Sequence, residues 1–249
     1  MNAVPTPPPL ALALSEVPRA GIDSLRLVAS IGRLIRSHNR GDDHPVLVLP
    51  GYGAADGSTA VLRFFLKRIG YRTFALEAGR NIEDHGNRIR SVDDASRFRE
   101  QLVDVAVGRV REIHEATQEP VSLIGWSMGG LYALDASRHV PEITRRVITL
   151  GAPFGDLRGT SVFNLMRRLS GSQVSIDEQD FDGWLDKARA PAVPTRVIYS
   201  ERDGIVGRDI AMLPDSPLLR AVPVNSSHLG FTLNVDALEQ IAAALAERA

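Results

Sequence analysis

Short apolar runs alternate with longer amphipathic stretches along most of this chain, and this alternation constrains the fold more than any other feature. The apolar runs lie at residues 46–49, 71–76, 121–124, 146–150, 195–199 and 219–224. Apolar residues at helical spacing occupy residues 58–69, 93–116, 128–139 and 235–248. Strands that alternate with helices form βαβ units around a parallel sheet. We therefore expect an α/β domain with a mostly parallel central sheet of about six strands flanked by helices.

One domain of this kind uses the whole length of the chain. The sequence has 249 residues, so two large domains would each be small. We expect residues 1–17 to form a flexible Pro-rich leader and residues 18–249 to form the domain. The interval from 153 to 194 is too long for a plain loop or a single crossover helix, and it predicts a short helical lid insertion at about residues 154–190.

A helix is expected directly after the leader. Its apolar stripe consists of Ile22, Leu25, Val28, Ile31 and Ile35. A basic amphipathic helix on a membrane shows such a stripe, but so does any helix docked on a domain, and we favour docking through these five residues.

The composition excludes several classes of function. With 29 basic and 30 acidic residues the net charge is −1, so we expect no nucleic-acid partner. The absence of cysteine excludes thiolate metal sites and a cysteine nucleophile. The apolar run at 10–14 is short and no Lys or Arg precedes it, so we expect a cytoplasmic location without a signal peptide or an integral membrane segment.

The sequence Gly-Trp-Ser-Met-Gly at residues 125–129 fits the pattern G-x-S-x-G. The pattern alone is weak, but here it follows a predicted strand and precedes a predicted helix. In this setting the chain turns sharply and exposes the serine at the strand's carboxyl end. Ser127 is therefore the candidate nucleophile.

Two further residues could complete a relay with Ser127. Asp203 and His228 each lie in a loop just after a predicted strand, where open α/β sheets place functional residues. Glu201 is an alternative acid. His85, in a polar loop after the second strand, is the other candidate base.

Five segments together resemble the α/β-hydrolase family, and in particular its small bacterial lipases and esterases. They are VLVLPGYG, SLIGWSMGG, VITLGAPFGD, RVIYSERDGIV and NSSHLGF, in that order between residues 45 and 249. The resemblance implies a triad in the chain order Ser127, Asp203 and His228, and its D-G-I-V segment favours Asp203 over Glu201. It also implies an oxyanion hole formed by the backbone N–H groups of Tyr52 and Met128. Many relatives have His where this chain has Pro50, which matters little for a backbone donor.

The substrate pocket is less well defined by the sequence. Candidate lining residues are Trp126, Phe154, Phe163, Met166 and Leu229, although the lid's apolar residues could equally pack on the core. We expect a serine esterase or lipase acting on a small uncharged ester, without a metal or cofactor. An acyltransferase with the same triad and a non-catalytic binding protein on the same fold remain alternatives.

Overall fold

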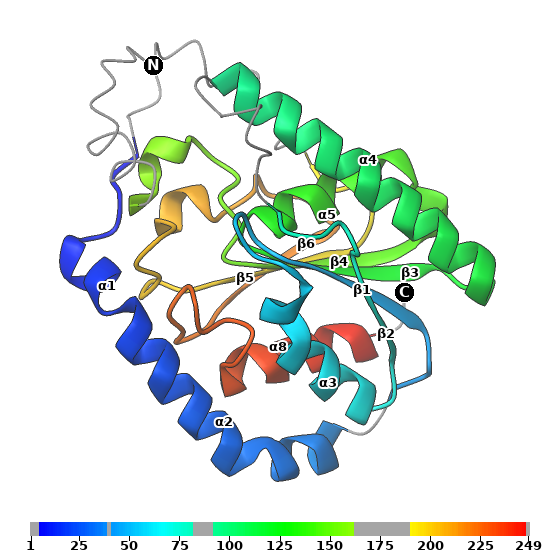
Figure 1. Ribbon diagram of the computed structural model, residues 1–249, viewed down its shortest axis with the longest axis horizontal. Helices are drawn as coiled ribbons and strands as arrows, with labels where there is room; N and C mark the ends of the chain where they lie inside the picture. The colour runs from blue at the N-terminus through cyan, green and yellow to red at the C-terminus, as the bar shows by residue number, and fades with distance from the viewer. Residues whose placement is uncertain (1–4, 39–40, 82–91, 162–189, 248–249) are drawn as a thin grey trace.

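The computed structural model describes residues 5–38, 41–81, 92–161 and 190–247, which form a central sheet with helices on both faces (Figure 1). The strands are β1 (Pro45–Leu49), β2 (Arg72–Ala75), β3 (Val121–Trp126), β4 (Thr144–Leu150), β5 (Thr195–Tyr199) and β6 (Leu219–Pro223). Their order in the sheet is β2-β1-β3-β4-β5-β6, and every neighbouring pair is parallel. The predicted α/β fold with a six-stranded parallel sheet is confirmed.

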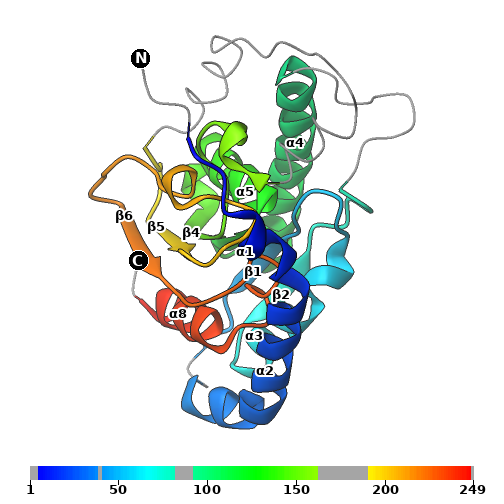
Figure 2. The same ribbon diagram turned by 90° about the vertical axis from the view of Figure 1, so that its left-hand side faces the viewer.

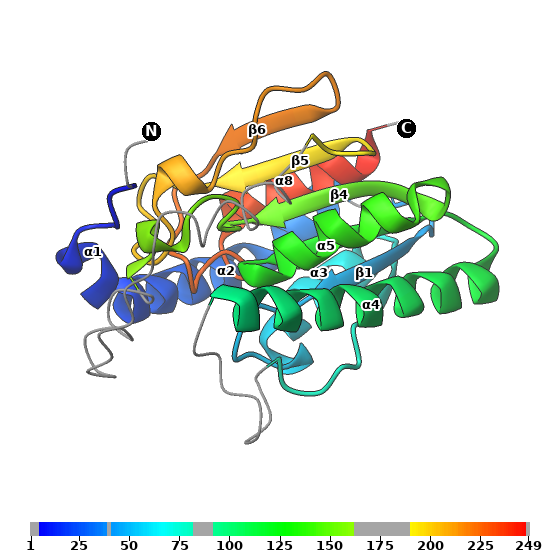
Figure 3. The ribbon, with the colours of Figure 1, turned by 90° about the horizontal axis from the view of Figure 1, so that it is seen from above.

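Helices cover the two faces of the sheet in different sets. One face is covered by α4 (Val92–Thr117) and α5 (Met128–His139), as Figure 3 shows. The other is covered by α2 (Glu16–His38), α3 (Ala60–Arg68) and α8 (Val235–Ala246). The helices expected at 58–69, 93–116, 128–139 and 235–248 are therefore present, with bounds that differ by a few residues, and a short 3-10 helix (Asp56–Thr59) precedes α3.

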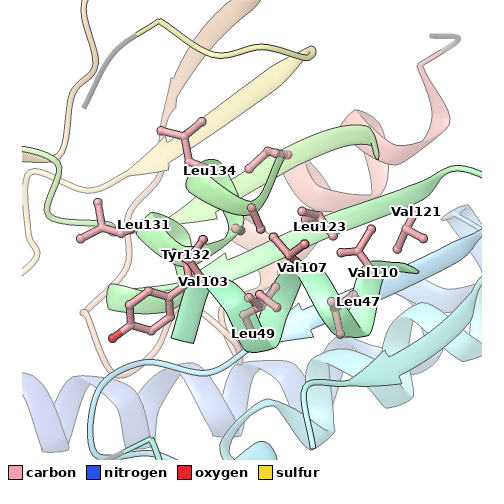
Figure 4. Close-up of a cluster of buried hydrophobic side chains, with 14 of the residues drawn as sticks. Leu47, Leu49, Val103, Val107, Val110, Val121, Leu123, Leu131, Tyr132 and Leu134 are labelled. Carbon is pink, nitrogen blue, oxygen red and sulfur yellow. The ribbon is translucent and has the colours of Figure 1, made fainter. Parts of the chain in front are cut away.

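Strand β1 shows why the central strands are apolar at every position. Leu47 and Leu49 point into the core beneath α4 and α5, whereas Val46 and Val48 point into the core on the opposite side. Figure 4 shows the first of these cores, in which Leu47 and Leu49 lie close to Val107 of α4. Because successive side chains of a strand alternate between faces, a strand covered on both faces has no solvent-facing position.

The N-terminal segment is more ordered than the sequence suggested. The leader was expected to end at residue 17, but α1 (Leu10–Leu14) lies inside it and α2 already begins at Glu16. Figure 2 shows these two helices running down one side of the molecule. The segment packs tightly, since a Cβ added at Gly204, in the loop after β5, would lie 2.5 Å from the Leu12 carbonyl oxygen. Residues 1–4 lie outside the described residues.

Helix α2 exists as expected, but it is rotated relative to the predicted stripe. Ile22, Leu25 and Val28 are 49%, 72% and 76% exposed, so the prediction that they pack on the domain is wrong. Ile31 and Ile35, further along the predicted stripe, are partly buried and do pack on the core. The residues buried on α2 are instead Glu16, Asp23, Leu27 and Leu34. The physical reason is that buried carboxylates require hydrogen-bond partners, and the partners of Glu16 and Asp23 lie in two loops of the domain.

Helix α2 has 23 residues and still does not resemble a membrane span. In the part of the chain that the structure describes, no helix combines the length and the apolar character needed to cross a membrane.

The orientation of α2 can be tested with two leucines two positions apart. Leu27 packs in the core against α3 and α8, so Leu27→Ala should lower the free energy of unfolding by about 2–4 kcal/mol. Leu25 points to solvent, so Leu25→Ala should change it by no more than about 0.5 kcal/mol. Urea unfolding of both variants measures the difference, and equal losses would contradict this orientation.

Candidate active site

Ser127 lies in the sharp turn between β3 and α5, with φ 54° and ψ −127°. Residues other than glycine rarely adopt a positive φ, and the strain costs on the order of 1–3 kcal/mol. The flanking glycines permit the turn. A Cβ at Gly125 would lie 2.2 Å from the carbonyl oxygen of Gly129, and one at Gly129 would lie 2.5 Å from the Leu49 carbonyl oxygen. The structure thus forms the elbow that the sequence motif predicts.

His228 and Asp203 lie in line with this serine. The Nε2 atom of His228 is 2.9 Å from the Ser127 hydroxyl oxygen, and its Nδ1 atom is 2.7 Å from the Asp203 Oδ2 atom. Because a carboxylate only accepts hydrogen bonds, Nδ1 carries the proton and Nε2 faces the hydroxyl as an acceptor. The second oxygen of Asp203 accepts the N–H groups of Ile205 and Val206, both at 2.8 Å. The carboxylate is therefore fixed on both sides.

The sheet explains why three residues far apart in the chain meet. Ser127 directly follows β3, Asp203 follows β5 and His228 follows β6. These strands are parallel, so their carboxyl ends, and the loops that leave them, lie along one edge of the sheet. The structure brings the three predicted residues together at this edge.

The environment of His228 favours the charged form of its ring. Burial by itself lowers the pKa of this imidazole, but the charge of Asp203 and its hydrogen bond oppose that effect, and Glu16 adds further negative charge. The net result is a pKa above the ordinary value of 6.5. The site thus stabilises an imidazolium, which is the state a base reaches after it accepts a proton.

Glu16 contacts the loops of both Asp203 and His228 and was not predicted from the sequence. Its buried carboxylate accepts the N–H of Gly204 at 2.7 Å and the N–H of Leu229 at 3.0 Å. A signal was present in the sequence, since Glu16 and Asp23 share one helical face with Leu27 and Leu34. The expectation of a leader up to residue 17 obscured it.

The loop after β1 passes directly beside Ser127. A Cβ added at Gly51 would lie 3.0 Å from the Ser127 Cβ and 3.6 Å from its hydroxyl oxygen. The buried Asn81, also missed from the sequence, holds this loop by donating its amide to the carbonyl oxygens of Pro50 at 3.2 Å and Gly51 at 3.0 Å. Its backbone N–H also donates to the Ala54 carbonyl at 2.8 Å.

The two predicted oxyanion donors lie on segments that flank Ser127. Met128 is the first residue of α5, and the first N–H groups of a helix have no acceptor within it. Tyr52 follows Gly51 in the loop, and its ring packs edge-on against Phe98 with centroids 6.0 Å apart. Donation by these two N–H groups to a bound substrate stays a prediction.

The predicted pocket residues have different surroundings. Trp126 donates its indole N–H to the His228 carbonyl at 3.0 Å, and the half-buried Leu229 is held through its backbone by Glu16. Phe154 is 1% exposed and packs in the core beneath α4 and α5, which differs from its expected place in an open pocket. Phe163, Met166, most of the expected lid and His85 lie outside the described residues.

A second Ser–His–Asp set lies at the opposite end of β1 and β3. His44 is hydrogen-bonded through Nδ1 to Asp42 and through Nε2 to the Ser122 hydroxyl at 2.8 Å. Ser122 is fully buried within β3, so no substrate can reach it. Ser127 is only partly buried and lies on a strained elbow beside a helix N-terminus. Accessibility and backbone conformation therefore distinguish the two serines, although both face an imidazole.

A metal centre and a cavity are two other kinds of site that the described residues could form. Among the described residues there is no group of three or more His, Asp or Glu side chains placed to hold a metal ion. An open cavity of about 520 Å³ lies beside the carboxyl ends of β5 and β6, lined partly by Glu201, Arg202 and Asp236, and none of Ser127, Asp203 and His228 lines it.

Comparisons with known proteins agree with this architecture. Neither protein-family models nor curated proteins match the sequence. Among solved structures, a lipase-esterase related protein from Clostridium acetobutylicum aligns at 12% identity with a TM-score of 0.60, covering 82% of this chain and 95% of that one. A monoacylglycerol lipase from Paleococcus ferrophilus aligns at 13% identity with a TM-score of 0.52, covering 80% and 94%.

The lipase B of Aspergillus fumigatus aligns at 20% identity with a TM-score of 0.54, covering 82% of this chain. This chain spans about half of that lipase, 53% of its length. At these identities the likeness shows the fold and not the reaction. With its parallel sheet and the sharp turn at Ser127, the chain has the fold of the α/β-hydrolases.

Proposed function

We propose that this protein is a serine hydrolase that cleaves carboxylic esters through an acyl-enzyme. The observation that carries the proposal is the continuous relay from the Ser127 hydroxyl through His228 to Asp203, with contacts of 2.9 and 2.7 Å. Both contacts lie within the range required for proton transfer between positioned groups. The lipase and esterase names of the structural neighbours support the same reaction class.

In the first half of the proposed reaction, Ser127 attacks the ester carbonyl carbon. His228 accepts the hydroxyl proton at Nε2, and Asp203 stabilises the resulting imidazolium through Nδ1–H. The carbonyl oxygen becomes an oxyanion and accepts the N–H groups of Met128 and Tyr52. His228 then returns the proton to the leaving alcohol, and the acyl group remains on Ser127.

In the second half, water takes the place of the alcohol. His228 removes a proton from the water as it attacks the acyl carbon, and then gives the proton back to Ser127. Each oxyanion donor contributes roughly a hundred- to a thousandfold in rate. The Asn81 hydrogen bonds fix the loop that carries one of these donors, so the donor needs little rearrangement during the reaction.

Replacing the nucleophile tests this proposal directly. We expect wild-type protein to hydrolyse p-nitrophenyl esters of short to medium acyl chains, and Ser127→Ala to lose at least about a thousandfold in kcat. The matched control is Ser122→Ala, which removes the hydroxyl of the buried second Ser–His–Asp set and should keep ester turnover. Equal rates in wild type and Ser127→Ala would refute the assignment of Ser127, and no turnover in wild type would favour a non-catalytic protein on this fold.

The pH dependence of turnover tests the role of the acid. His228 must be neutral to accept a proton, so kcat/KM should fall as pH drops through a pKa above 6.5. Asp203→Asn removes the charge that raises this pKa and leaves burial, which lowers it. We expect the acidic limb to move to lower pH in this variant, with kcat reduced by roughly ten-thousandfold. An unmoved limb would exclude Asp203 as the partner of the base.

A further inference from the structure

Helix α2 reaches the active-site edge of the sheet through the carboxylate of Glu16. Its two oxygens accept N–H groups from two loops that leave different strands: Gly204 at 2.7 Å to Oε1 and Leu229 at 3.0 Å to Oε2. Gly204 directly follows Asp203, and Leu229 directly follows His228. One buried side chain from the N-terminal helix thus connects the backbone of the acid loop to the backbone of the base loop.

We propose that Glu16 is a positioning residue of this active site, which holds the Asp203 and His228 loops at the separation that the relay requires. This inference rests on the proposed function, because it assigns a role within the same relay. Glu16 does not touch the reacting atoms and acts through the two loops.

The choice of residue type fits this role. The two N–H donors here reach separate oxygens of one side chain, and only a carboxylate offers two acceptor oxygens without a competing donor. A buried carboxylate is costly unless it is paired and fully hydrogen-bonded. Here Arg19 supplies the pairing, with its guanidinium 2.8 Å from Oε1. Arg19 also donates to the Arg202 carbonyl, which adds a further contact to the acid loop.

A second carboxylate, about two helical turns along α2, secures the base loop. Asp23 accepts the Asn234 amide at 2.9 Å, and the Ser227 hydroxyl lies 3.5 Å from its other oxygen. The approach is close, since a Cβ added at Gly230 would lie 2.3 Å from that oxygen. Because the same face of α2 carries both acids, the rotation of the helix is coupled to the position of the loop that contains His228.

Glu16 also acts on His228 through its charge. The carboxylates that raise the pKa of the His228 ring are Asp203 and Glu16, against the opposing effect of burial. Arg19, bound to Glu16, offsets part of this negative charge, and Asp23 lies beyond Ser227 on the same side. A purely structural role of Glu16 would leave the His228 pKa unchanged when the charge is removed, which gives the experiment a specific readout.

The test compares Glu16→Gln with Glu16→Asp in the full chain. Gln keeps the size but offers one acceptor oxygen and no charge, so kcat for a p-nitrophenyl ester should fall about ten- to hundredfold, as for the loss of a hydrogen bond to a charged group, with KM nearly unchanged. The acidic limb of the pH profile should move to lower pH. Asp keeps the charge but is too short for both donors, so kcat should fall while the limb stays closer to that of wild type.

The matched control is Glu115→Gln, an exposed glutamate of α4 on the opposite face of the sheet, which should leave kcat and the pH profile unchanged. NMR titration of the His228 ring in wild type and both Glu16 variants gives the pKa without any turnover. A lower His228 pKa in Glu16→Gln supports the role of Glu16 even if the wild-type protein does not hydrolyse esters. The titration therefore distinguishes a failure of the Glu16 proposal from a failure of the proposed function. If Glu16→Gln does not fold, the kcat and the His228 pKa of Glu16→Asp test the proposal instead.

A folded Glu16→Gln variant with wild-type kcat and an unmoved His228 pKa would overturn the proposal. A loss of activity that merely parallels a loss of folded protein, with the His228 pKa unmoved in the folded fraction, would overturn it as well. A wild-type kcat in Glu16→Asp would also overturn the proposal. Thermal unfolding monitored by circular dichroism identifies the folded fraction at the assay temperature.

Discussion

The hydrogen bond between the Asp203 carboxylate and the Nδ1–H of His228 is the interaction on which the rest of this site depends. It fixes the tautomer that leaves Nε2 facing the Ser127 hydroxyl, and it opposes the effect of burial on the imidazole pKa. Both residues lie in loops, so further hydrogen bonds are needed to hold them in place. That support comes from the N–H groups of Ile205 and Val206 on the acid and, outside both loops, from Glu16 of α2.

A serine, a histidine and an aspartate in line do not by themselves define an active site in this molecule. The set formed by Ser122, His44 and Asp42 has similar contacts, yet its hydroxyl is buried within a strand. Burial of the His44 ring and the positive charges of Arg145 and Arg146 lower the pKa of His44, although Asp42 opposes them, whereas the pKa of His228 is raised. What separates the two serines is the turn at the carboxyl end of β3, which places Ser127 beside a helix N-terminus and the loop after β1.

The sequence was sufficient for those features that local spacing determines. Apolar runs of strand length gave the six strands, and Gly125 and Gly129 around Ser127 gave the elbow, because both patterns reflect steric requirements within a few residues. The orientation of α2 was not accessible in this way. Its apolar residues suggest the wrong face, since Leu25 and Val28 are as apolar as the buried Leu27 and Leu34. Helical spacing does place Glu16 and Asp23 on the face of Leu27 and Leu34, but what buries this face is the set of partners about 190 to 210 positions away, including Gly204, Leu229 and Asn234.

This long-range decision links packing to chemistry. The same face of α2 that inserts Leu27 and Leu34 between α3 and α8 carries Glu16 at the triad loops. A helix gains little from burying carboxylates, because desolvation offsets most of what their hydrogen bonds return. The apolar contacts must therefore supply the free energy that keeps α2 docked, and the carboxylates select its rotation. Under the role proposed for Glu16, the core leucine Leu27, about three helical turns from Glu16, contributes to the alignment of Ser127, His228 and Asp203. A shift of α2 at Leu27 would displace Glu16 and, with it, both loops.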